Sequence, residues 1–168
     1  MSHAPGTDRS AFDEFVHARG PALARTAYLL TGDHHLAEDL LQTALMKTAQ
    51  HWERIHTSPE AFVRRTLYHQ NISWWRRRRF AETRLDGYDD ASSPRDPDLR
   101  LTLAEALRQL TVKQRTVLVL RFYEDLTEVQ TAAVLGISPG TVKSTSRHAL
   151  GRLRTLAPEL ADLMGADA

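Results

Sequence analysis

The stretch from Glu128 to Arg154 constrains the fold more than any other part of the chain. It reads EVQTAAVLGISPGTVKSTSRHALGRLR. Two short helices can cross closely when the first carries a small residue, the turn tolerates a left-handed backbone and the second buries an aliphatic side chain. Ala132, Gly136 and Val142 meet these requirements at spacings of four and six residues. The pattern predicts a helix-turn-helix.

The charges of this stretch favour a nucleic acid as partner. No acidic residue lies between Glu128 and Glu159. Side chains near the start of the second helix can reach base edges or phosphates, and the first N–H groups of that helix can hold a phosphate oxygen. The candidate DNA-contacting residues are Ser138, Thr141, Lys143, Ser144 and Arg147. The alternative is an ordinary capped helical hairpin whose basic face is only solvated.

Residues 11–80 form a helical block with two clear helix starts. Asp33, which follows Gly32, is placed to cap a helix. Apolar residues recur along this helix at spacings of three and four and so define one face. They are Ala37, Leu40, Leu41, Ala44, Leu45, Thr48 and Trp52. Ser58 as N-cap and Pro59 at the first helical position then begin a second long helix, which runs into the arginines at 76–79.

A segment without helical periodicity separates this block from the rest of the chain. Residues 85–97 read LDGYDDASSPRDP, the composition of a linker. Beyond it, Thr111 with Gln114 and Thr127 with Gln130 form capping boxes that begin two short helices. No alternating strand pattern occurs. The sequence therefore predicts an all-α chain of two small helical domains joined by a flexible acidic linker.

Composition excludes several other classes of protein. The 22 Lys and Arg nearly cancel the 21 Asp and Glu, so net charge alone predicts no partner. The chain has no cysteine, and its eight histidines show no pair at metal-binding spacing. No apolar run approaches the roughly 20 residues of a membrane helix, and no signal peptide is seen. Without a phosphate loop or nucleophile elbow, we expect a cytoplasmic protein that is no enzyme and uses no cofactor or metal.

The stretch 72–80, ISWWRRRRF, is a second candidate binding surface. From Arg64 to Arg84 there are seven arginines and one acidic residue. Trp74 and Trp75 belong to two apolar stripes about 100° apart, so both cannot comfortably face one small core. An aromatic edge exposed beside arginines can grip phosphates and stack on unpaired bases. The alternative is that both tryptophans are core residues and the arginines extend from a helix end.

Together these pieces resemble a known family, the extracytoplasmic-function (ECF) sigma factors of bacterial RNA polymerase, in particular their actinobacterial SigE-like subgroup. Three stretches carry the resemblance, which covers almost the whole chain: AYLLTGDHHLAEDLLQTALMKTAQHW, PEAFVRRTLYHQNISWWRRRR and LRQLTVKQRTVLVLRFYEDLTEVQTAAVLGISPGTVKS. They are similar to sigma domain 2, its promoter-melting helix and sigma domain 4. The resemblance implies domain 2 over residues 9–80, a linker over 81–97 and domain 4 over 98–158.

The resemblance also implies roles for individual residues. The surface that docks on the coiled coil of the largest polymerase subunit would comprise Asp39, Leu40, Gln42, Thr43 and Met46. The surface for the minus-ten element would comprise His56, Ser58, Arg64, Arg65, His69, Ser73, Trp74, Arg76, Arg77, Arg78 and Arg79. The helix-turn-helix would read the minus-thirty-five element. The implied partners are core RNA polymerase, through this coiled coil and the flap, promoter DNA and an anti-sigma factor; the free chain would be a monomer without membrane insertion.

Some residues depart from the family pattern. His69 stands where many relatives carry asparagine, and Thr145 and His148 replace basic residues common on the recognition helix. These differences bear on base preference. Leucine is frequent at the place of Trp75, so we assign Trp75 to the core and Trp74 to the exposed edge.

Two other classes of protein fit parts of the sequence. A free-standing helix-turn-helix regulator would use its amino-terminal block to sense a ligand or to dimerise, and a helical adaptor would bind protein only. The arginines between residues 64 and 79 count against the first, because a ligand-sensing domain has no need of them.

Replacement of Arg76 to Arg79 by alanine is expected to lower promoter opening and to flatten its salt dependence. Each lost phosphate contact removes about 0.9 from the logarithmic salt slope on duplex DNA. Open-complex formation measured over a salt series tests this, and a series identical to that of the parent would contradict it.

Overall fold

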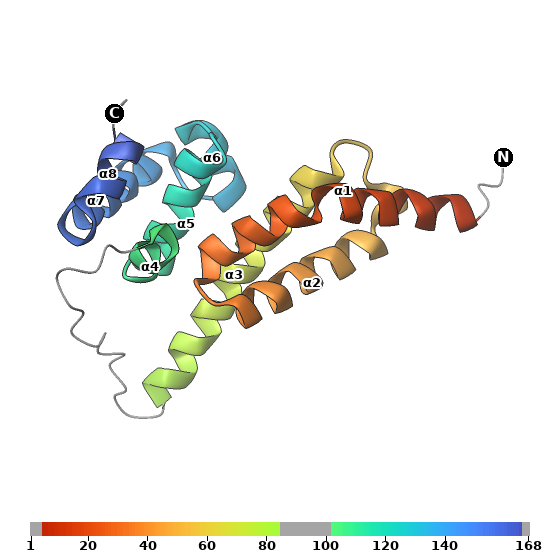
Figure 1. The fold of residues 1–168 in the computed structure, drawn as a ribbon, viewed down its shortest axis with the longest axis horizontal. Helices are drawn as coiled ribbons and strands as arrows, with labels where there is room; N and C mark the ends of the chain where they lie inside the picture. Colours follow the sequence, from red (N-terminus) through yellow and green to blue (C-terminus); the bar gives the residue numbers. More distant parts are fainter. Residues whose placement is uncertain (1–4, 85–101, 166–168) are drawn as a thin grey trace. The chain divides into compact units, whose positions relative to one another are not determined.

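The computed structural model describes residues 5–84 and 102–165, and the regular elements within these ranges are all helices (Figure 1). The chain divides into two compact units, residues 1–70 and 71–168, and the division falls within the helix Pro59–Arg84. The predicted all-α fold is confirmed. Most of the predicted linker, from residue 85 onward, lies outside the described residues, and the predicted domain boundaries stay predictions.

The first unit contains two long helices and the start of a third. These are α1 (Pro5–Thr31), α2 (His34–Gln50) and α3 (Pro59–Arg84), with one 3-10 turn (Trp52–Arg54) before α3. α1 packs along α2, as Figure 1 shows. Fully buried aliphatic side chains come from all three helices: Leu23, Ala27, Leu30, Leu40, Ala44, Val63 and Leu67. The Lys47 ammonium donates a hydrogen bond of 2.9 Å to Gln70 Oε1, which ties α2 to α3.

The predicted start of α2 is confirmed. Gly32, at a φ of 69°, makes the turn after α1. The carboxylate of Asp33 then accepts a hydrogen bond of 3.0 Å from the N–H of Leu36. Two buried threonines in this unit, Thr31 and Thr48, donate hydrogen bonds of 2.9 and 2.8 Å to the carbonyls four residues earlier. Because a buried hydroxyl without a partner is costly, these bonds allow threonine in the core.

Between residues 102 and 165, the described part of the second unit after α3, there are five further α-helices. They are α4 (Leu103–Arg108), α5 (Val112–Leu118), α6 (Glu128–Leu135), α7 (Pro139–Leu156) and α8 (Pro158–Gly165), with a π-helical turn (Val119–Tyr123) after α5. Both predicted capping boxes form, since Thr111 and Gln114, and likewise Thr127 and Gln130, exchange hydrogen bonds between side chain and backbone. A third box, Thr102 with Glu105, begins α4. Neither α4 nor α8 was predicted.

α6 and α7 form the predicted helix-turn-helix. Gly136 ends α6 in the left-handed region at a φ of 67°. The Ser138 hydroxyl accepts a hydrogen bond of 3.1 Å from the N–H of Thr141 and so caps α7. Ala132 and Val142 share one buried cluster with Val117 of α5, and the partly buried Leu135 and Ile137 pack against it. The small residue, the turn and the buried aliphatic therefore have their predicted roles.

Gly136→Ala is expected to destabilise the helix-turn-helix by about 1–2 kcal/mol, because a side chain disfavours the left-handed backbone. No atom lies within 4 Å of the added Cβ, so the cost is that of the backbone alone. Gly151→Ala is the matched control. It lies in regular helix, also with nothing within 4 Å of an added Cβ, and should stabilise α7 by about 0.5–1 kcal/mol. Hydrogen exchange of the α6 and α7 amides measures both, and increased protection in Gly136→Ala would contradict the assignment.

Candidate functional site

Helix α7, the second helix of the helix-turn-helix, presents its cations to solvent. Lys143, Ser144 and Arg147 are exposed and Thr141 is partly buried. The Ser138 hydroxyl lies 2.8 Å from the Thr141 hydroxyl. The Ser144 hydroxyl donates a hydrogen bond of 3.2 Å to the Thr141 carbonyl. The three hydroxyl groups thus have local partners at the start of the helix. Lys143 and Arg147 are four residues apart and share one face of α7.

The structure places the predicted minus-ten residues along α3 and the turn before it. The exposed members are His56, Ser58, Arg65, His69, Arg76 and Arg77, and the partly buried ones are Arg64, Ser73 and Trp74. The side chains of Arg78 and Arg79 lie outside the described residues. The Ser58 hydroxyl caps α3 by accepting a hydrogen bond of 3.2 Å from the N–H of Ala61. Arg77 donates a hydrogen bond of 3.1 Å to the Ser73 hydroxyl. Ser58 and Ser73 therefore already have partners within the chain.

The two tryptophans have similar exposure but different contacts. Trp74 and Trp75 are both partly buried. The guanidinium of the buried Arg115 lies over the Trp75 ring, 5.5 Å from its centroid. The structure therefore gives neither the fully buried position of a core residue nor the exposure of a free edge. The assignment of Trp75 to the core and Trp74 to the edge stays a prediction.

Arg64 has a partner that the sequence-based surface did not include. Its guanidinium donates two hydrogen bonds to Oε1 of Glu60, 3.2 Å from Nε and 2.6 Å from Nη2. Arg19 of α1 contacts the other oxygen, Oε2, at 2.7 Å. The hydrogen bond from Arg64 lowers the pKa of Glu60; partial burial opposes this, and the charges of Arg64 and Arg19 add to it. Glu60 is therefore a carboxylate at neutral pH.

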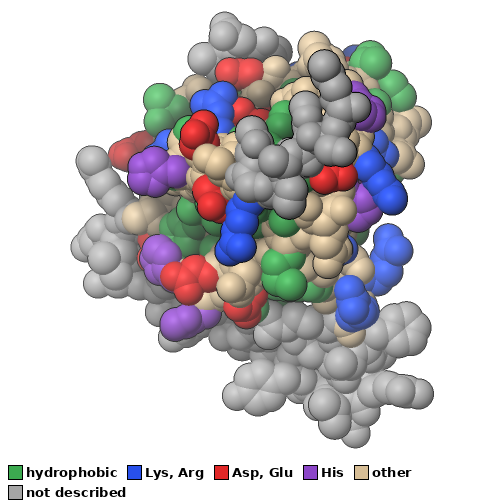
Figure 2. Space-filling view, turned by 90° about the vertical axis from the view of Figure 1, so that its right-hand side faces the viewer, with side chains coloured by type: hydrophobic (Ala, Val, Ile, Leu, Met, Phe, Trp, Pro, Cys, Tyr) green, Lys and Arg blue, Asp and Glu red, His purple; other side chains and the backbone are tan. Residues whose placement is uncertain are grey.

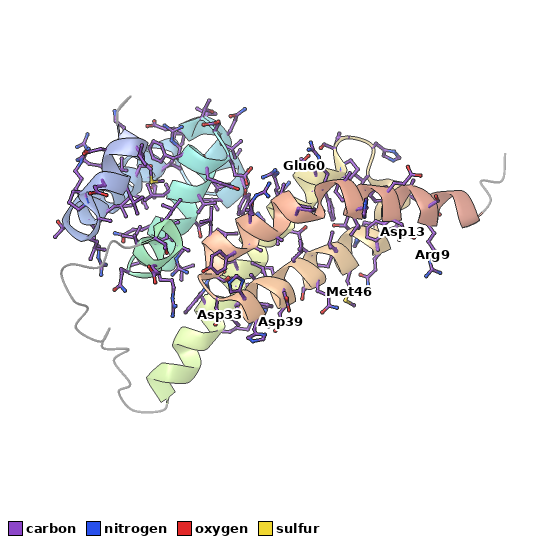
Figure 3. All side chains as sticks on the ribbon, in the orientation of Figure 1. Arg9, Asp13, Asp33, Asp39, Met46 and Glu60 are labelled. Carbon is purple, nitrogen blue, oxygen red and sulfur yellow. The ribbon has the colours of Figure 1, made fainter. Side chains whose placement is uncertain are left out.

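The outer face of α2 carries the predicted polymerase-docking residues, with one exception. Asp39 and Gln42 are exposed, and Met46 is 60% exposed. Thr43 is partly buried, and its hydroxyl donates a hydrogen bond of 2.8 Å to the Asp39 carbonyl. In Figure 3, Asp39 and Met46 project from the same side of α2, away from α1. Leu40 differs from the prediction, because it is 0% exposed and faces the core.

Charge on the surface is mixed. On the face drawn in Figure 2, acidic and basic side chains are interspersed. This agrees with the near balance of 22 basic and 21 acidic residues. Local groups such as Lys143 with Arg147 therefore matter more for binding than the charge of the whole chain.

Two further findings concern the described residues. No group of three His, Asp or Glu side chains among them could hold a metal ion. None of the helices described is both long and apolar enough to cross a membrane.

Known proteins share both parts of this architecture. The family model for Sigma-70 region 2 matches residues 15–81, and the one for Sigma-70, region 4 matches residues 106–155. The RNA polymerase sigma-E factor of Streptomyces avermitilis is 42% identical over 148 residues, which cover 85% of this chain and 83% of that protein. The chain therefore belongs to the sigma-70 family of RNA polymerase sigma factors.

More distant relatives specify the branch of the family. The ECF RNA polymerase sigma factor SigL of Mycobacterium tuberculosis is 34% identical over 162 residues, 90% of this chain and 89% of SigL. A co-crystal structure of the sigma factor RpoE with the anti-sigma factor NepR from Bartonella quintana has a TM-score of 0.67 at 27% identity, covering 87% of this chain and 96% of that one. The prediction of an ECF-type sigma factor is confirmed. It takes precedence over the two alternatives, a free-standing helix-turn-helix regulator and a helical adaptor.

Lys143 and Arg147 are expected to contribute differently to promoter recognition. A side chain that reaches base edges gives about 1–3 kcal/mol of discrimination against a wrong base, whereas a phosphate contact affects all sequences alike. Lys143, nearer the helix start, should set sequence preference, and Arg147, one turn later, should mainly set affinity. Selection from randomised minus-thirty-five sequences tests this. An unchanged consensus for Lys143→Ala would contradict the assignment.

Proposed function

We propose that this sigma factor docks on core RNA polymerase through the outer face of α2, opens the minus-ten element with α3 and reads the minus-thirty-five element with α7. A sigma factor directs RNA polymerase to promoters and starts transcription there. The observation that best supports the proposed division of roles is the separation of core and surface on α2. Residues that complete the core lie on one face, and Asp39, Gln42 and Met46 lie on the other.

The docking role of α2 rests on the chemistry of its outer face. The buried positions Ala37, Leu40, Ala44 and Thr48 complete the inner face without any of the exposed residues. Asp39 and Met46 are seven residues apart, so they lie two turns apart on one side of the helix. Methionine is enriched in protein–protein interfaces, and the Asp39 carboxylate two turns away can fix the orientation of a partner. Leu40 contributes by holding the helix to the core.

The opening role of α3 rests on its exposed cations and the partly buried Trp74. Arg65, Arg76 and Arg77 are exposed and can neutralise phosphates. An aromatic ring at the surface can stack on a base that has left the duplex, and such stacking contributes about 1–3 kcal/mol per base. Together these side chains favour the separated strand over the closed duplex.

The implied partners follow from the same assignment. Core RNA polymerase meets α2 through its coiled coil and the second unit through its flap, and promoter DNA meets α3 and α7. The Bartonella relative was solved with an anti-sigma factor. An anti-sigma factor is a corresponding partner for this chain, which works in the cytoplasm with the polymerase and has no catalytic activity of its own.

Asp39→Arg is expected to abolish assembly with core RNA polymerase while leaving the fold intact. Asp39 is exposed, so the change leaves the core filled. A misplaced charge in a packed interface costs several kcal/mol, enough to lose most binding at working concentrations. Co-elution with core polymerase measures assembly, circular dichroism measures the fold, and transcription from a defined promoter measures activity.

Glu14→Arg is the control for the Asp39 experiment, because Glu14 is an exposed acid on α1 and the change of charge is the same. It should bind core polymerase and transcribe like the parent. Normal binding by Asp39→Arg, or equal loss in both variants, would contradict docking through α2.

A further inference from the structure

Glu60 lies at the start of α3, within the surface proposed to meet the minus-ten element (Figure 3). Each of its carboxylate oxygens has an arginine partner. Oε1 accepts from Nε and Nη2 of Arg64 at 3.2 and 2.6 Å, and Oε2 lies 2.7 Å from Nη2 of Arg19. The Arg64 pair spans one turn of α3, and the Arg19 pair joins α3 to α1.

The three side chains differ in how firmly they are held. The side chains of Glu60 and Arg64 are 20% and 23% exposed, whereas that of Arg19 is 55% exposed. Arg65, the next residue, is exposed. With Glu60 ionised at neutral pH, the three residues carry one net positive charge where the two arginines alone would carry two. A phosphate that approached Arg64 would have to displace a carboxylate already bonded at 2.6 Å.

We propose that Glu60 is a positioning residue that sets the affinity of this surface for the DNA backbone, and the salt dependence of that binding, by holding Arg64 away from phosphates. The proposal rests on the minus-ten role of α3. Phosphate contacts carry no sequence information and supply essentially all of non-specific binding. A carboxylate that occupies one arginine of the surface therefore weakens binding to any DNA backbone. Because a phosphate contact affects all sequences alike, the weakening is equal for a selected promoter sequence and for any other duplex.

Glu60→Gln separates this role from a purely structural one. Glutamine has the shape of glutamate and can still accept a hydrogen bond from Arg64, but it does not neutralise the guanidinium. Because partly exposed ion pairs contribute little to stability, the variant should remain folded. A structural tie between α1 and α3 predicts only a lower melting temperature. The proposed role predicts a change in the salt dependence of DNA binding.

The experiment uses holoenzyme assembled from core RNA polymerase and the full chain. Equilibrium binding is measured over a potassium chloride series on two DNAs: a minus-ten sequence selected by the parent holoenzyme from a random pool, and an unselected duplex of the same length. For Glu60→Gln we expect tighter binding to both DNAs and a logarithmic salt slope steeper by about 0.9 for one released arginine. The ratio of specific to non-specific binding should stay that of the parent, because the added contact is to phosphate.

Two controls identify the arginine and exclude a general charge effect. Glu60→Gln combined with Arg64→Gln should return the slope to that of the parent, because the released cation is gone. Glu14→Gln makes the same change of charge on the exposed side of α1 and should leave the salt slope and the DNA affinity unchanged.

Three outcomes would overturn the proposal: a Glu60→Gln salt slope and DNA affinity equal to the parent's at any melting temperature, weaker binding to both DNAs, or an equal effect of Glu14→Gln. Failure of the proposed minus-ten role gives a different result. In that case the parent holoenzyme would select no minus-ten sequence from the pool.

Discussion

The helix-turn-helix depends on the close packing of Val117, Ala132 and Val142. α5 and α6 are helices of 7 and 8 residues. Isolated helices shorter than about 12–15 residues are marginal in water, so these two need tertiary contacts. Val117 and Val142 are 0% exposed and Ala132 is 4% exposed, which joins α5, α6 and α7 in one cluster. The position of the basic face of α7 follows from this packing, since the turn between α6 and α7 is fixed by Gly136 and Ser138.

The first unit differs, because one set of helices supplies a core and also carries the two proposed binding surfaces. Buried aliphatic residues and threonines that bond to their own helix fill the inner faces. Exposed residues such as Asp39 and Arg65 can then change without loss of packing. Glu60 and Arg64 stand between these two groups, since they are partly buried and bonded to one another. Their position, fixed by the fold of the unit, sets part of the charge of its surface.

Local signals explain which features the sequence predicts. Asp33, Thr111, Thr127 and Gly136 each act on backbone groups within four residues, and each has its predicted role. The Thr102–Glu105 capping box has the same signature and could have been found. The sequence placed Leu40 on the apolar face of its helix, and the family resemblance placed it among the docking residues. Its burial agrees with the apolar face. The pairing of Arg19 with Glu60 joins two helices, so no local pattern could predict it.

Transcription by core RNA polymerase, with and without the purified chain, is the most direct test of its role. Start sites are mapped on a pool of bacterial promoter DNA, and bound DNA is footprinted at those sites. If the chain is a sigma factor that uses both units, transcripts begin at defined positions only when it is present, and protection covers a minus-ten and a minus-thirty-five element upstream. Transcription that never depends on the chain, or an effect seen only when another sigma factor already occupies the polymerase, would contradict this.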